Sequence, residues 1–177
     1  MPPIIQVKVA FKNRGNIDLK QKLRVALESA NGSYVSVGIN EGSKRYDDGV
    51  TVAQVALWME FGTEVGGEVR CPQRSFLRST FREQQATINA FRLEGLRNLM
   101  LKGWSVEKAL TMIGFRTVVL IQNKIKSNVP PPLSPAYAAL KKQRGQPNET
   151  LIATGALLDA IDFRVHLKSA APTPGGT

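Results

Sequence analysis

The sequence contains very little cysteine and histidine, the residue types that most often build zinc sites and nucleophilic dyads. Its single cysteine, Cys71, excludes an internal disulfide, as is typical of a protein made in a reducing cytoplasm. Its single histidine, His166, falls on the polar face of a predicted strand, where a surface role is the favoured interpretation. With no second histidine, neither a zinc site nor a Cys–His dyad is supported, and nothing marks Cys71 as an activated thiol.

The signatures of phosphate binding and of catalysis are missing as well. Neither a GxxxxGK[ST] loop nor a strand-linked GxGxxG occurs. Asp47 and Asp48 are adjacent in a loop, and neighbouring carboxylates need not converge on a metal ion. We therefore expect no metal, no cofactor and no enzymatic activity. A small hydrolase or nuclease is the weakest alternative, because no cluster of acids and no base–nucleophile pair supports it.

Long apolar runs are absent too. No segment approaches the roughly 20 apolar residues that a membrane-spanning helix needs. The N-terminus lacks the charged-then-apolar pattern of a signal peptide. The sequence therefore predicts a soluble, unexported protein without a membrane partner.

Acidic residues are few: 14 Asp and Glu stand against 24 Lys and Arg, which gives a formal net charge of +10 at pH 7. The excess is concentrated in residues 103–146, where Glu107 is the only acid and aromatic residues are sparse. A solvated face or an acidic protein partner is the favoured interpretation, and direct contact with DNA is the alternative. The candidates for facing DNA are Lys124, Lys126, Lys141, Lys142 and Arg144.

What the sequence does contain is a mixture of strand and helix patterns. Alternating apolar and polar residues predict strands over 5–11, 35–39 and 161–167. Apolar residues at spacings of three and four predict helices over 17–29, 51–62, 75–101, 105–127 and 135–144. The intervening segments 40–50 and 62–71 are polar or rich in glycine and predict loops, the second flexible or ordered only by a partner.

These elements predict an α+β fold. We expect a small, mostly antiparallel sheet of at least three strands, formed by the N- and C-terminal strands and packed against several helices, two of them long. A length of 177 residues favours one domain, which we assign to residues 1–168. The remaining segment 169–177, SAAPTPGGT, is small and rich in proline and glycine, and predicts a flexible tail.

The clearest helix signal, over residues 51–62, introduces a family resemblance. Thr51 and Gln54 have the spacing of a capping box, and Gly62 is a typical helix stop. The segment 58–63, WMEFGT, and the segment 72–78, PQRSFLR, resemble the signature of bacteriophage tail-completion proteins of the virion-morphogenesis type.

Two further segments fit the same family in the same order. Residues 151–161, LIATGALLDAI, are similar to its C-terminal signature, and residues 37–39, VGI, fit the strand before its helix. The resemblance covers roughly residues 33–168. Cys71 and Ser75 depart from the pattern, because isoleucine and a second proline are common at these positions.

The resemblance implies a structural, non-enzymatic protein of a tailed-phage virion, assembled in the host bacterial cytoplasm. It implies a homo-oligomeric ring, expected to be six-fold, at the neck or at the head-proximal end of the tail. The ring would be threaded by genomic DNA and would bind other neck, connector and tail proteins. Tail terminator and head-side adaptor are alternatives within this class, and a basic nucleic-acid-binding module without a virion role is the alternative outside it.

The same segments supply the candidate residues for contact with a partner subunit. They are Trp58, Glu60, Phe61, Arg74, Phe76 and Arg78. Arg74, Arg78 and Arg82 are four residues apart, so we expect them on one helix face, with Glu60 as the first acid to test as a partner. A Glu60–Arg74 pair serves either as an internal brace or as a bond between subunits, since arginine holds carboxylates bidentately. Trp58 is either a core residue or an interface anchor.

Overall fold

The computed structural model describes residues 17–39 and 49–168. The predicted strand over 5–11, the Asn16 helix cap, most of the predicted loop over 40–50 and the predicted tail over 169–177 lie outside these residues. Within them no helix is both long enough and apolar enough to cross a membrane.

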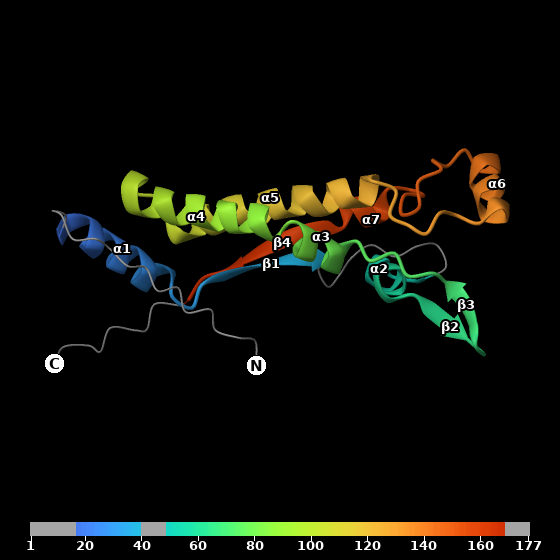
Figure 1. The fold of residues 1–177 in the computed structure, drawn as a ribbon, viewed down its shortest axis with the longest axis horizontal. Coiled ribbons are helices and arrows are strands. Elements are labelled where there is room, and N and C mark those ends of the chain that lie inside the picture. Colours follow the sequence, from blue (N-terminus) through green and yellow to red (C-terminus); the bar gives the residue numbers. More distant parts are fainter. Residues whose placement is uncertain (1–16, 40–48, 169–177) are drawn as a thin grey trace.

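The described chain has an α+β architecture, which confirms the predicted fold class (Figure 1). In chain order its elements are α1 (Ile17–Ala30), β1 (Tyr34–Ile39), α2 (Val52–Phe61), β2 (Thr63–Val65), β3 (Glu68–Cys71), α3 (Leu77–Glu83), α4 (Gln85–Lys102), α5 (Val106–Lys126), α6 (Pro135–Gln143), α7 (Ala156–Asp159) and β4 (Ile161–His166).

The central sheet joins two strands that are far apart in the sequence. β1 and β4 pair antiparallel, with Tyr34 opposite His166 and Ile39 opposite Ile161. This confirms the predicted pairing of the C-terminal strand with an N-terminal one. In the described residues the sheet has two strands, and α5 packs across it.

Gly114 allows α5 to approach the sheet closely. A Cβ placed on Gly114 would lie 2.5 Å from Phe163 Cδ2 and 2.8 Å from Val35 Cγ2. Both side chains come from the sheet, one from each strand, so the missing side chain at position 114 sets the spacing between helix and sheet. α4 lies along α5, and α1 contacts the rest of the fold chiefly through α4 at one end of the molecule (Figure 1).

The structure corrects the prediction of one continuous helix over 75–101. The chain forms α3 and then α4, with Gln84 between them at φ −101° and ψ 17°. Helix-type bonds continue on both sides of the bend, because the Gln84 N–H donates to Thr80 O and the Ile88 N–H donates to Gln84 O. No glycine or proline marks this bend, so the helical periodicity runs through it unbroken.

The prediction of a loop over 62–71, flexible or ordered only by a partner, is also wrong. β2 and β3 form an antiparallel hairpin. Its two turn residues, Gly66 and Gly67, have φ values of +63° and +84°, which glycine adopts without steric cost. Two residues with positive φ are what a tight hairpin turn requires. Figure 1 shows the hairpin projecting from the end of the molecule that carries α2.

The hydrophobic core is small for the number of apolar residues in the chain. Thirteen apolar side chains of the described residues are buried, and three of them are alanines. Seventeen large apolar side chains of the described residues are exposed. Single exposed apolar residues are normal on a protein surface, whereas exposed apolar residues that lie together mark sites of contact.

Candidate assembly site around helix α2

A buried carboxylate, Glu60 at the end of α2, organises the site. Only 5% of Glu60 is exposed. Its Oε1 accepts hydrogen bonds from Ser75 Oγ (2.6 Å), from the Arg78 N–H (3.1 Å) and from Arg78 Nε (2.9 Å). Its Oε2 accepts from the N–H groups of Phe76 and Leu77, both at 2.9 Å. Glu60 therefore binds the free amides at the start of α3, where no local side chain provides a cap.

These bonds favour the charged form of Glu60. Burial by itself raises the pKa of the Glu60 carboxyl, but hydrogen bonds from Ser75, Leu77 and Arg78 outweigh it, so the pKa lies below its usual range. The guanidinium of Arg78 also lies over the ring of Phe61, 4.2 Å from its centre. The carboxylate is thus fixed in its ionised state by the residues around it.

The internal form of the predicted Glu60–Arg74 pair is wrong, because Arg78 is the arginine that bonds Glu60 within the chain. Arg74 is buried and points elsewhere: its Nε donates to Pro131 O at 2.8 Å and its Nη2 donates to Pro132 O at 3.1 Å. The reason is position along the backbone. Arg74 precedes α3, whereas Arg78 lies in its first turn, so the two side chains leave the chain in different directions. They do not share one helix face.

The third segment of the family resemblance packs against the inner face of α2. Leu157 of α7 and Ile161 of β4 are buried in the same cluster as Val52 and Ala56 of α2. Phe76 is buried there as well, so its ring belongs to the core and is not on the exposed surface. The segments that carry the resemblance therefore form one contiguous unit.

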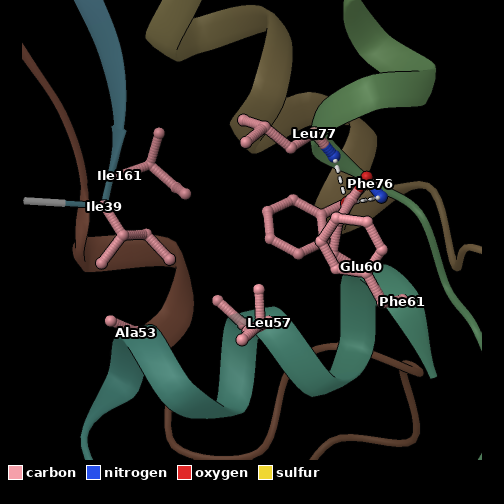
Figure 2. Close-up of a pocket in the computed structure, with 9 residues that line it drawn as sticks. Ile39, Ala53, Leu57, Glu60, Phe61, Phe76, Leu77 and Ile161 are labelled. Carbon is pink, nitrogen blue, oxygen red and sulfur yellow. Dashed lines mark hydrogen bonds between the residues drawn. The ribbon is translucent and has the colours of Figure 1, made fainter. Parts of the chain in front are cut away.

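The outer face of α2 borders an open apolar pocket of about 210 Å³ (Figure 2). We call this pocket the α2 groove. Ala53, Leu57 and Phe61 line it from α2, and among the described residues Glu60 is the only polar one in the lining. Its other lining residues are Ile39, Ala56, Phe76, Leu77 and Ile161. The oxygens of Glu60 already accept bonds from the chain (Figure 2), so the groove offers contacts for an apolar group.

Large apolar side chains extend the surface beyond the groove. Leu57 is 57% exposed and Phe61 is 56% exposed, and Trp58 is exposed as well, so Trp58 is not part of the core that the described residues form. Val65 and Val69 of the hairpin are exposed next along the chain. Such a surface is typical of contact with another protein.

The five candidate bases for DNA contact do not have the same environment. Lys126, Lys142 and Arg144 are exposed and form no ion pair with other described residues. Lys124 is paired with Glu83, with 2.8 Å between Nζ and Oε2. Lys141 is buried, so it is not available to a partner.

Lys141 instead anchors α6 to the following loop. Its Nζ donates to Glu149 O and to Ile152 O, both at 2.6 Å. Burial lowers the pKa of Lys141, and the Glu149 carboxylate partly opposes this. The sequence alone did not indicate this role, because Lys141 lies beside the exposed Lys142 in a segment that reads as uniformly basic.

The lone thiol and the lone imidazole have different surroundings. Burial raises the pKa of the Cys71 thiol, although Arg74 opposes it, so the thiol is not activated. The ring of His166 stacks on Tyr34 with 4.4 Å between centres, and its Nε2 lies 3.0 Å from Ser36 Oγ. Among the described residues no group of three or more potential ligands is placed to hold a metal ion.

Sequence reasoning missed two features of the site that had a detectable signal. The Gly66–Gly67 pair between residues of strand propensity indicates a hairpin. Ser75, noted only as a departure from the family pattern, donates the shortest bond to Glu60. Comparison of the chain with family models, with curated proteins and with solved structures finds no match.

Proposed function

We propose that the protein is a structural, non-enzymatic component of a tailed-phage virion. It acts as a tail-completion or neck protein and forms a closed ring, six-fold, at the head–tail junction or at the head-proximal end of the tail. Its partners are further copies of itself and neighbouring neck, connector and tail proteins, and assembly takes place in the host bacterial cytoplasm.

The observation that carries the proposal is the convergence of the signature segments on Glu60. Residues 58–63 and 72–78 are joined by the Glu60 bonds, and residues 151–161 pack behind them. Their outward face carries Leu57, Trp58 and Phe61 rather than polar catalytic groups.

The imbalance between buried and exposed apolar side chains supports a role in assembly. A protein that worked alone would gain little from leaving seventeen large apolar side chains in water. Subunits of closed rings bury such surface against their neighbours. A ring also displays Lys126, Lys142 and Arg144 once per subunit, so a small monomer charge becomes a basic collar.

The test is the native mass of the purified protein by light scattering, followed by its addition to tails of the same phage that lack it. The proposal expects association beyond the monomer and tails that become able to join heads. It is contradicted if the protein neither associates nor restores joining. Tight DNA binding by such a monomer, falling steeply between about 50 and 200 mM salt, would favour the nucleic-acid-binding alternative.

A further inference from the structure

The central sheet has an open edge along β4. Among the described residues, β4 pairs with β1 on one side and with no strand on the other. An open edge presents a row of backbone N–H and C=O groups that can pair with a further strand. We call this side of β4 the β4 edge.

The helix that covers the sheet carries uncovered apolar side chains on one flank. Phe115 of α5 is 60% exposed and Val119 is 37% exposed. Ile113 of the same helix faces α4, because a Cβ placed on Gly95 of α4 would lie 3.2 Å from Ile113 Cδ1. Phe115 follows Ile113 by two residues, about 200° around the helix, so it points away from α4. Val119 is one turn further along the same flank.

This flank of α5 lies on the β4 side of the sheet. Gln122 follows Val119 by three residues and Phe115 by seven, so it belongs to the same flank. Its Nε2 donates to Leu158 O at 3.2 Å, in α7, which leads directly into β4. The uncovered apolar side chains of α5 and the β4 edge are therefore on the same side of the molecule. A third strand placed there would pair with β4 and lie beneath Phe115 and Val119.

Residues 5–11, IQVKVAF, have the pattern that such a strand requires. They lie outside the described residues, and the predicted sheet includes them as a strand. Their apolar row would continue the inner face of the sheet, where Phe163 contacts α5, and their polar row would continue the outer face, where Arg164 is exposed. A segment of seven residues also matches β4, which has six.

The reach of the chain decides which copy receives the strand. β1 and β4 pair antiparallel, and sheets of one kind of pairing are favoured over mixed ones. In an antiparallel pair with β4, Phe11 lies near Ile161, at the end of the sheet away from α1. Figure 1 shows α1 extending from the opposite end of the sheet, with Ile17 at its far end.

The strand cannot serve its own β4 edge in this direction. The path from Phe11 to Ile17 would cover the length of β4, roughly 20 Å, and most of α1, roughly 20 Å more. Six residue steps span at most about 22 Å. The sheet that an antiparallel strand completes is therefore that of a second copy.

We propose that residues 5–11 of one copy add as an antiparallel strand to the β4 edge of the next copy, beneath Phe115 and Val119. This inference rests on the proposed function in taking the chain to be a subunit of an assembly. The contact is heterologous, since each copy offers one segment and one edge, and it closes when the rotation per copy completes a circle.

Crosslinking tests the contact between two chains. In a Cys71→Ser background, chains with Gln6→Cys, Lys8→Cys or Ala10→Cys are each mixed with Arg164→Cys chains and oxidised by air with a copper catalyst. All four positions belong to the polar rows, so the apolar contact stays intact. A disulfide between the two chain types is expected from at least one mixture, because side chains opposite each other on neighbouring strands are close.

The matched control replaces Arg164→Cys by Leu93→Cys, an exposed position on α4, and is expected to give no such product. The absence of a product in all three mixtures, or equal yields with the control, would overturn the inference. Chains that carry both Lys8→Cys and Arg164→Cys distinguish the two copies. A disulfide within one chain, without one between chains, would show that the strand completes its own sheet and would also overturn it.

Native mass measures what the contact contributes to association. The segment variant is Val7→Gln with Val9→Gln, and the edge variant is Phe115→Gln with Val119→Gln. Each is expected to weaken association at least about 10-fold, since each removes apolar burial from the contact. Unfolding curves establish that each variant folds.

The controls for native mass are Gln6→Thr with Lys8→Thr on the polar row and Leu93→Gln on α4. Both are expected to keep the mass of the natural protein. A monomeric natural protein, unchanged association in either contact variant, or loss in either control contradicts the contact. If the crosslinks form but the protein does not let tails join heads, the strand contact stands and the virion role fails. If tails join heads and no crosslink forms, the virion role stands and the strand contact fails.

Discussion

At Glu60, replacing the carboxylate by an amide keeps the shape of the side chain and removes its charge. Glu60→Gln is expected to lower the free energy of unfolding at pH 7 by about 2–3 kcal/mol, because hydrogen bonds to a buried charged acceptor are lost and Arg78 loses its partner. Urea unfolding of the purified variant measures the change. Glu64→Gln is the matched control, since Glu64 is exposed and its carboxylate bonds no described residue, and it should change stability by less than about 0.5 kcal/mol.

The same variant has a predicted dependence on pH. The pKa of Glu60 is lowered in the folded protein, so its carboxylate stabilises the fold above its unfolded-state pKa, and this contribution is lost as the pH falls through the folded pKa. The stability difference between the natural protein and Glu60→Gln should therefore be constant near neutral pH and shrink below about pH 4. A difference that stays constant to acid pH would show that the charge of Glu60 contributes nothing.

Lys141 and Lys142 are neighbours in sequence with opposite expected roles. Lys141→Met leaves two backbone carbonyls without a donor and should cost about 2 kcal/mol of stability. Lys142→Met changes an exposed side chain and should be neutral within about 0.5 kcal/mol. Thermal or urea unfolding of the two variants measures both changes in stability. Equal effects of the two substitutions would contradict the anchoring role of Lys141.

At the scale of elements, the packing of α5 on the sheet makes a prediction against helix propensity. Alanine is a better helix former than glycine by about 1 kcal/mol. Gly114→Ala should nevertheless destabilise the protein by about 1–3 kcal/mol, because the new Cβ would collide with Phe163 and Val35.

Gly95→Ala is the control for this substitution, measured by the same urea unfolding. At Gly95 the nearest atom is Ile113 Cδ1 at 3.2 Å, the end of a flexible side chain that can move. Gly95→Ala should therefore cost much less than Gly114→Ala. A stabilising effect of Gly114→Ala would contradict this close packing, because it would mean that α5 lies further from the sheet than in the structure.

Much of the fold could be predicted because the signals for its elements are local. The Thr51 capping box and the alternation in β1 and β4 are both found in the structure. The bend at Gln84 could not be predicted, since the helical pattern continues through it. Glu60 bonds Arg78 and not Arg74 because α3 begins after Arg74. The four-residue spacing of the two arginines does not show where the helix begins.

At the scale of the whole molecule, the exposed apolar surface should make stability depend on protein concentration. In the proposed assembly, association buries surface that the monomer leaves in water, so the folded, associated state is stabilised by mass action. The midpoint of thermal unfolding should therefore rise when the concentration is raised tenfold. Calorimetry at two concentrations measures this. A midpoint independent of concentration would indicate that the chain works as a monomer.

The position of Glu60 also bears on the order in which the chain folds and opens. α3 begins without a cap of its own, and its first amides are bonded by a carboxylate sixteen residues upstream, on α2. The first turn of α3 therefore has no stable form until the last turn of α2 is in place. The end of α2 and the start of α3 should therefore open together. The amide hydrogens of Leu77 and Arg78 should then exchange with solvent at the same rate as the amide hydrogens in the final turn of α2.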